Sequence, residues 1–111
     1  MFTEKITILR AGTRKDRYGN VVPDGTVEEL AVPFRVAVQP ANQAEGVGGR
    51  EVTLMTGWRL FTPEGRDLDL RATDQVRWQG QVLEVVGEVA RWPGFTGGVD
   101  HVEADLQRIE S

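Results

Sequence analysis

The sequence predicts an all-β protein in which six or seven short strands form a small barrel or a sandwich. Apolar residues recur at every second position in several segments, which is the period of a strand with one buried face. Glycine accounts for 13 of the 111 residues, and turns spaced this closely are typical of all-β chains. No segment has the period of an amphipathic helix, and the length suits a single domain, residues 1–111.

The N-terminal half is predicted to hold two full strands and a short one. Residues 2–10 alternate between two faces and are rich in β-branched side chains. Val21-Val22 forms at most a short strand, because the turn residues 23–25 follow at once. Residues 31–39 alternate again, and Pro33 marks an edge, a bulge or the start of that strand because proline cannot donate to a ladder.

The C-terminal half is predicted to hold the longest strand, a hairpin and a closing strand. Residues 51–62 carry apolar side chains on both faces, and the charged residues 66–74 are expected to be irregular or a single helical turn. A tight turn at Gln79-Gly80 makes the hairpin. The predicted strands are 2–10, 31–39, 51–62, 76–79, 81–87 and 100–109. The predicted core is Ile6, Ile8, Phe34, Val36, Leu54, Trp58, Val76, Val85 and Leu106.

Residues 40–50 interrupt the alternation. They contain three glycines, and Val47 is their single branched apolar residue. We therefore expect a long mobile loop here. Loops of nearly this length without regular structure are uncommon in compact domains and are often functional.

A second segment, residues 88–99, is rich in glycine and also aromatic. Pro93 and the neighbouring glycines favour an irregular backbone. Trp92 either caps the open end of a barrel or projects as a contact, and the sequence leaves both alternatives open. Two large aromatic side chains on a glycine-rich loop need a cover, and such residues beside an arginine are typical of interfaces. The predicted interface residues are Arg91, Trp92, Pro93 and Phe95.

The composition excludes several classes of function. The absence of cysteine removes disulfides and thiol chemistry, and Ser111 is the only serine, so a serine nucleophile is excluded as well. A net charge of −4 disfavours tight binding to nucleic acid. No apolar run approaches the ~20 residues of a membrane span, so we expect no membrane partner.

Few residues remain for catalysis or metal binding. His101, the single histidine, is expected on the last strand in a solvated position. Asp67 and Asp69 could offer oxygens to a hard cation, but a solvated acidic loop beside Arg66 and Arg71 explains them better. We therefore expect a protein that is not an enzyme and that needs no metal and no cofactor.

Six motifs follow one another along nearly the whole chain. They are Leu9-Arg10 with Asp16-Arg17-Tyr18-Gly19-Asn20; Thr56-Gly57-Trp58-Arg59-Leu60-Phe61; Leu70-Arg71-Ala72-Thr73-Asp74-Gln75-Val76-Arg77-Trp78; Gly80-Gln81-Val82-Leu83-Glu84-Val85-Val86-Gly87-Glu88; Arg91-Trp92-Pro93; and Gly97-Gly98. In this order and spacing they resemble the head-to-tail stopper, or head-completion, proteins of long-tailed phages. The resemblance implies a small β-barrel.

The resemblance also implies a structural role in the virion. Such a protein forms a ring in the phage neck below the portal and adaptor rings, helps to retain packaged DNA and offers a docking platform to the tail. The implied partners are further copies of the chain, with six favoured over twelve, the adaptor or portal ring, the tail terminator or tail tube, and DNA through non-specific contact in the channel. During assembly the protein would lie in the host cytoplasm.

In this family a long loop reaches into the channel, and residues 40–50 are the stretch that matches. The implied gating residues are Gln43, Ala44, Glu45, Gly46, Val47, Gly48, Gly49 and Arg50. Their only charges are Glu45 and Arg50, so we expect the loop to obstruct DNA sterically and not to grip it. The alternative is a small barrel-type interaction module that binds a peptide or nucleic acid as a monomer.

Overall fold

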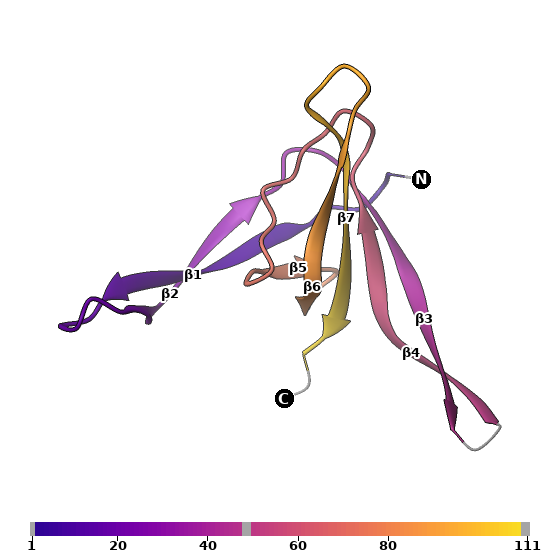
Figure 1. Cartoon of the computed structure of the whole chain (residues 1–111), viewed down its shortest axis with the longest axis horizontal. Helices are drawn as coiled ribbons and strands as arrows, with labels where there is room; N and C mark the ends of the chain where they lie inside the picture. The colour runs from indigo at the N-terminus through magenta and orange to yellow at the C-terminus, as the bar shows by residue number, and fades with distance from the viewer. Residues whose placement is uncertain (1, 48–49, 110–111) are drawn as a thin grey trace.

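The computed structural model describes residues 2–47 and 50–109; over 42–47 and 50–56 the description is of the backbone. This part of the chain contains seven strands and no helix (Figure 1), so the predicted all-β class is confirmed. The strands are β1 (Thr7–Lys15), β2 (Val21–Ala31), β3 (Ala37–Val47), β4 (Arg50–Phe61), β5 (Gln75–Trp78), β6 (Gln81–Pro93) and β7 (Val99–Arg108).

All seven strands belong to one antiparallel sheet with the order β2-β1-β5-β6-β7-β4-β3. This order leaves β2 and β3 at the two edges, so strand pairing does not close the sheet and the predicted barrel is not confirmed. The segments that precede β1 and β3 nevertheless meet. Glu4 and Val36 each donate a backbone N–H to the other's carbonyl, both at 2.9 Å. The sheet is therefore open, but it curls so far that the Glu4–Val36 bridge joins the segments before β1 and β3.

The core lies inside this curl. Five predicted core residues are buried, namely Ile6, Ile8, Val36, Val76 and Leu106. Three more are partly buried against the core, namely Phe34, Trp58 and Val85, and the side chain of Leu54 lies outside the described part. The core also contains Leu60, Leu68, Leu70, Trp78, Leu83, Val102 and Ala104.

Residues 62–74 are irregular, as predicted, but they contribute to the core. Leu68 and Leu70 are 4% and 0% exposed, so this segment folds back over the curled sheet. Asp74, which is 2% exposed, accepts a hydrogen bond from the backbone N–H of Arg71 at 2.9 Å. This bond tightens the turn that leads into β5.

Two hairpins extend beyond the body of the protein (Figure 1). β1 pairs with β5 only over Thr7–Leu9, and past that point it has β2 alone as a neighbour. We call residues 11–27 the N-terminal arm. β4 pairs with β7 only from Gly57 onward, so residues 42–47 and 50–56 form a second, central arm. The radius of gyration is 16.4 Å, against about 13 Å for a compact chain of this length.

The predicted mobile loop at residues 40–50 is wrong over most of its length. β3 continues to Val47 and β4 begins at Arg50, with Gly46 opposite Glu51 in the ladder. The alternation of apolar residues stops here, but a strand pair needs only backbone hydrogen bonds. Gly48 and Gly49 lie outside the described residues.

Several other strand boundaries also differ from the prediction. β1 is Thr7–Lys15 and not 2–10, and β2 runs through Pro23–Gly25 to Ala31. Pro23 is tolerated because β2 is an edge strand, where a missing N–H breaks no ladder on the outer side. The hairpin at Gln79-Gly80 is confirmed, and its two turn residues have φ of 49° and 74°, as a type I′ turn requires.

Candidate functional site

An exposed aromatic pair lies where β6 and β7 run side by side. The rings of Trp92 and His101 are parallel within 10°, with centroids 5.9 Å apart. Asp100 Oδ2 lies 2.7 Å from Nδ1 of His101, and Glu103 Oε2 lies 3.2 Å from Nε2. Hydrogen bonds to these two carboxylates, that of Asp100 first, raise the pKa of His101. Trp92 remains 51% exposed, so half of its surface faces solvent.

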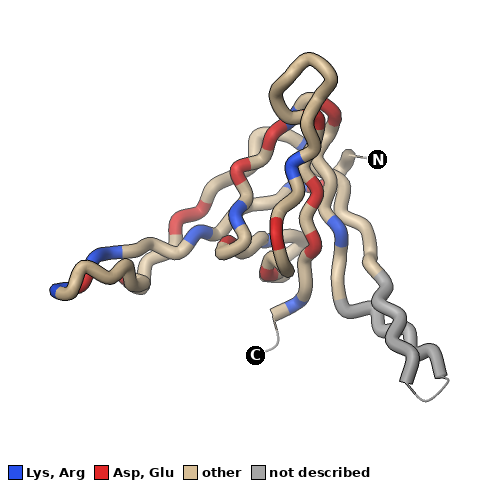
Figure 2. Tube along the Cα trace, viewed as in Figure 1, with Lys and Arg blue, Asp and Glu red and all other residues tan. Residues whose placement is uncertain are grey.

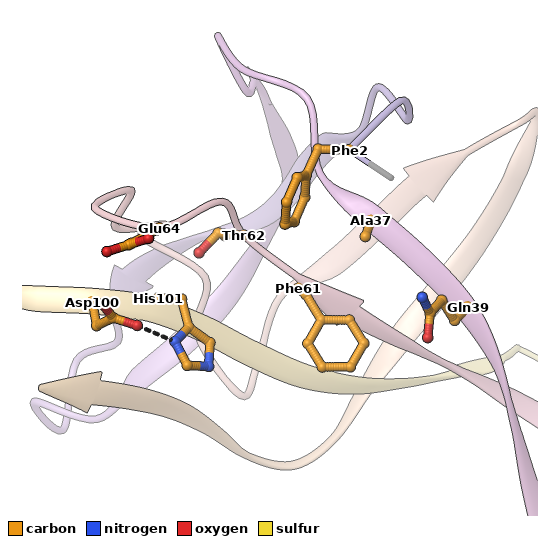
Figure 3. A pocket seen from close by; sticks show the side chains of 8 residues that line it. All are labelled: Phe2, Ala37, Gln39, Phe61, Thr62, Glu64, Asp100 and His101. Carbon is orange, nitrogen blue, oxygen red and sulfur yellow. Dashed lines mark hydrogen bonds and ion pairs between the residues drawn. The ribbon is translucent and has the colours of Figure 1, made fainter. Parts of the chain in front are cut away.

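A hollow of about 390 Å³ lies beside this pair. Its walls combine two aromatic rings with carboxylates and come from the N-terminus, β3, β4 and the start of β7. The lining residues are Phe2, Ala37, Gln39, Phe61, Thr62, Glu64, Asp100 and His101. Glu64, Asp100 and His101 gather at one end of the hollow, and Gln39 lies at the other (Figure 3).

The acidic end of the hollow is held by the buried side chain of Thr62. Its hydroxyl accepts a hydrogen bond from the Val102 N–H at 2.8 Å and donates one to the Arg66 carbonyl at 2.7 Å. The N–H of Gly65 donates to the Asp100 carbonyl at 2.5 Å. These bonds fix the turn after β4 against the start of β7, and so bring the carboxylates of Glu64 and Asp100 to the same rim.

The predicted interface residues separate into two groups. Phe95 is fully exposed in the loop between β6 and β7, and Trp92 is half-exposed, which disfavours the alternative of a buried cap. Arg91 instead holds the fold together, because its Nη2 donates to the carbonyls of Leu68 and Leu70 at 3.0 and 2.9 Å. The irregular backbone predicted for this stretch is wrong up to Pro93, the last residue of β6.

The strand β6 reaches Pro93 because a bulge restores its pairing with β7. The register shifts between Val86 and Ala90, and Gly87 within this step has a φ of 71°. A positive φ suits glycine, which has no Cβ to clash with the backbone. Glycines in this region therefore mark a bulge in a strand, and only residues 94–98 form the loop.

The predicted gating residues lie in the central arm. Gln43–Val47 belong to β3 and Arg50 to β4, and the ladder pairs Val47 with Arg50. The structure thus brings these segments together as paired strands. That they line a channel stays a prediction.

The tip of the N-terminal arm is a candidate that the sequence reasoning missed. It carries the cations of Arg14, Lys15 and Arg17 (Figure 2) and the side chain of Tyr18, which is 79% exposed. Asp16 shapes the turn, since its Oδ1 accepts hydrogen bonds from the N–H groups of Tyr18 at 2.8 Å and Asn20 at 2.9 Å. The signal available in the sequence was three cations around a tyrosine in a turn.

The acidic segment considered as a cation site is engaged in ion pairs. Asp67 lies 3.5 Å from Arg91, and Asp69 lies 3.3 Å from Arg10 and 3.7 Å from Arg71. Within residues 2–41 and 57–109, whose side chains are described, no three His, Cys, Asp or Glu residues gather as a metal site. The arrangement suits binding through charge and aromatic contact.

No protein-family model matches this chain, and no curated protein matches it. Among the described residues there is no helix with the length and apolar character needed to cross a membrane.

Proposed function

We propose that the protein is a structural, non-enzymatic component of the neck of a tailed phage. In this role it forms a ring below the portal and adaptor, helps to retain packaged DNA and provides the platform on which the tail docks. The observation that carries the proposal is the pair of arms, in which two strands extend from a small body and pair only with each other over the described residues.

The N-terminal arm supports an assembly role because it is poorly suited to stand alone. An isolated two-stranded hairpin is marginally stable in water. Along β2 only two of eleven residues are even partly buried, and Val21 and Val27 are 64% and 61% exposed. A ribbon with exposed valines gains stability when a partner covers it, as neighbouring subunits of a ring do.

The central arm supports the gating role through its reach. Seven residues of β4, Arg50–Thr56, precede the point where β7 joins the ladder. At roughly 3.3 Å per residue they extend about 23 Å from the body. Several arms of this length, converging on the axis of a ring, would narrow its channel.

The exposed aromatic side chains support docking between rings. Phe95 is fully exposed at the end of the β6–β7 hairpin, and Trp92 is half-exposed on the same hairpin. Large aromatic residues dominate the binding energy of many interfaces. A platform for an adaptor or a tail protein would place such residues at its contact face.

The alternative is a β-sheet module that binds a peptide as a monomer. The hollow between Phe2 and Phe61 favours this alternative, whereas the net charge of −4 speaks against nucleic acid as its ligand. The two functions differ in assembly. Electron microscopy of particles would reveal a ring of this protein at the neck under the first and none under the second.

A shortened central arm tests the gating role. Replacing Gln43–Leu54 by Asn-Gly joins Asn42 to Met55, which are partners in the ladder, through a favoured two-residue turn. We expect the variant to fold and to let DNA leak from tail-less heads. The matched control, Glu45→Gln with Arg50→Gln, keeps the arm length and should retain DNA. Full retention by the shortened variant would contradict the gating role.

Truncation of Trp92 tests the docking role. Because this side chain is half-exposed, Trp92→Ala should melt within a few degrees of the wild type but fail to join heads to tails. Trp78, which is 9% exposed, offers a matched comparison, and Trp78→Ala should lose about 3–5 kcal/mol of unfolding free energy. Normal joining by Trp92→Ala would remove this residue from the proposed interface.

A further inference from the structure

We infer that the tip of the N-terminal arm of one copy docks in the hollow between Phe2 and Phe61 of a second copy. The cationic tip consists of Arg14, Lys15, Arg17 and Tyr18. This contact would be the joint between neighbours in the proposed ring, so its biological meaning rests on the proposed function. The charges, the shapes and the positions of the tip and the hollow each support the contact.

The charges of the two surfaces are complementary. Residues 13–20 hold three cations and one anion, whereas the rest of the chain holds ten cations and sixteen anions. The carboxylate of Asp16 is engaged by two backbone N–H groups of its own turn, so the tip presents its cations outward. At the hollow, Glu64 is exposed and forms no ion pair with any described residue, and Asp100 stands on the same rim.

The shapes and polarities also match. Tyr18 is 79% exposed, so most of its surface faces solvent. The hollow offers the rings of Phe2 and Phe61 and a volume of about 390 Å³, within the roughly 300–1,000 Å³ typical of ligand pockets. Phe61 already receives the guanidinium of Arg59, 5.9 Å from its ring centroid. An aromatic ring flanked by cations is therefore the class of ligand that this hollow accepts.

The positions of the N-terminal arm and the hollow require that the arm of one copy docks on another copy of the chain. The N-terminal arm and the N-terminus beside the hollow lie on opposite sides of the molecule (Figure 1). The arm leaves the body at Arg10, which contacts Asp74, and five further strand residues at roughly 3.3 Å each carry the turn that holds Tyr18 about 17 Å away. A contact between two different surfaces can repeat from one copy to the next. The copies close into a ring when the rotation that relates neighbours returns to the first copy.

Another hollow among the described residues fits the tip less well. It is lined by Gln81, Val82, Arg108 and Ile109, so its one charge is a cation. A cationic tip would be repelled there. This contrast provides a control site on the same protein.

Cysteine pairs test the contact directly, because the chain has no cysteine of its own. We compare Asn20→Cys/Gln39→Cys with Asn20→Cys/Val82→Cys, each purified as the full chain and treated with a short bis-maleimide at high protein concentration. Both pairs keep the Tyr18 ring, the cations of the tip and the carboxylates of the hollow. The first pair should give a ladder of dimers and larger species on the order of tenfold faster than the second, since docking raises the effective concentration of the two thiols. At about 1 M salt, where the Debye length is ~3 Å, this advantage should shrink.

A charge exchange provides the second measurement. This measurement uses sedimentation of chains that carry no cysteine. Arg17→Glu and Glu64→Arg should each weaken self-association, and a mixture of the two variants should form a heterodimer that neither forms alone. Arg71→Glu, an equal charge change on the exposed loop away from both surfaces, should behave as the wild type.

Equal cross-linking rates at Gln39 and Val82, or faster cross-linking at Val82, would overturn the inference. So would a variant Arg17→Glu that self-associates like the wild type. Failure of the contact can be told apart from failure of the proposed neck function. If particles carry a ring whose tips and hollows do not cross-link, the inference fails and the neck role stands. If the cross-link forms but particles contain no such ring, the contact stands and the neck role fails.

Discussion

The body and the N-terminal arm share the strand β1 but follow different physical rules. Within the body, Ile8 and Leu9 are 3% and 8% exposed because β1 has β2 on one side and β5 on the other. Past Arg10 the same strand has one neighbour, and its residues are mostly exposed. A strand can therefore continue on backbone pairing alone after its buried face has ended. The arm adds reach and surface, whereas the body supplies the stability.

A buried ion pair marks the boundary between the two regions. Arg10 donates from Nε to Asp74 Oδ1 at 3.1 Å and from Nη2 to Oδ2 at 2.8 Å. Its Nη2 also donates to the Asp69 carbonyl at 2.7 Å. The carboxylate of Asp74 first, and that of Asp69 second, raise the pKa of Arg10 and keep it charged at any ordinary pH. The pair ties the base of the arm to the segment that crosses the core.

The largest contrast between body and arm should appear when apolar side chains are truncated. Leu70 is fully buried, so Leu70→Ala should lower the free energy of unfolding by about 2–5 kcal/mol. Val27 is 61% exposed in the arm, and Val27→Ala should change it by less than about 0.5 kcal/mol. Urea denaturation of the two variants measures both values. A similar loss for both would mean that the arm belongs to the folded core.

The next largest effect concerns the ion pair at the boundary. Asp74→Ala leaves the partly buried Arg10 without its main partner, and removing one member of a buried pair costs about 3–5 kcal/mol. Because Arg10 keeps Asp69 nearby, we expect the lower end, about 3 kcal/mol. The matched control is Asp69→Ala, whose carboxylate is exposed and should contribute less than about 1 kcal/mol. Equal effects in thermal unfolding would contradict the assignment of Asp74 as the main partner.

A smaller effect, in the body alone, should depend on pH. The pKa of His101 is raised above 6.5 by the carboxylates of Asp100 and Glu103. The protonated ring therefore stabilises the folded state fully below about pH 6.5, and this contribution is lost as the pH rises through the folded pKa. His101→Gln should cost up to about 1 kcal/mol near pH 5.5 and less near pH 8.5. If His101→Gln destabilised the protein more near pH 8.5 than near pH 5.5, the predicted direction of the pH dependence would be wrong.

The sequence predicted the body better than the arms, for a physical reason. Alternation identifies strands with one buried face, and it identified the core positions Ile6, Ile8 and Val36 correctly. It could not identify paired strands with two exposed faces, such as those of the N-terminal arm. It also missed Leu68 and Leu70, which are buried because an irregular segment folds back, held by the side chain of a distant arginine on β6.

The candidate site also has features that the sequence suggested and features that it could not predict. Local composition identified Trp92 and Phe95 as candidate contacts, but it left open whether Trp92 caps the fold or projects from it. The hollow could not be predicted, because Phe2, Phe61 and Asp100 are far apart in the chain and meet only through the sheet order and the bonds of Thr62. Long-range strand order is the information that local patterns lack.

Asp16→Ala is expected to have the smallest effect on the free energy of unfolding. It should also separate the behaviour of the arm from that of the body most clearly. The carboxylate of Asp16 accepts two backbone hydrogen bonds at the tip of the arm. Asp16→Ala removes both, but the arm contributes little buried surface, so the free energy of unfolding should change by less than about 0.5 kcal/mol. The control Asp16→Asn keeps the acceptor oxygen and should match the wild type.

The effect of Asp16→Ala should instead appear locally, in amide hydrogen exchange. A lost hydrogen bond costs about 0.5–1.5 kcal/mol, which corresponds to exchange roughly 2- to 10-fold faster in the residues around the tip. The amides of Val76 and Leu83, in the centre of the body, should keep their wild-type rates, because opening of the arm breaks none of their hydrogen bonds. Faster exchange in the body as well would show that arm and body open as one unit. Since the cations of the tip are presented by this turn, the same variant should also weaken self-association if the tip docks on a second copy.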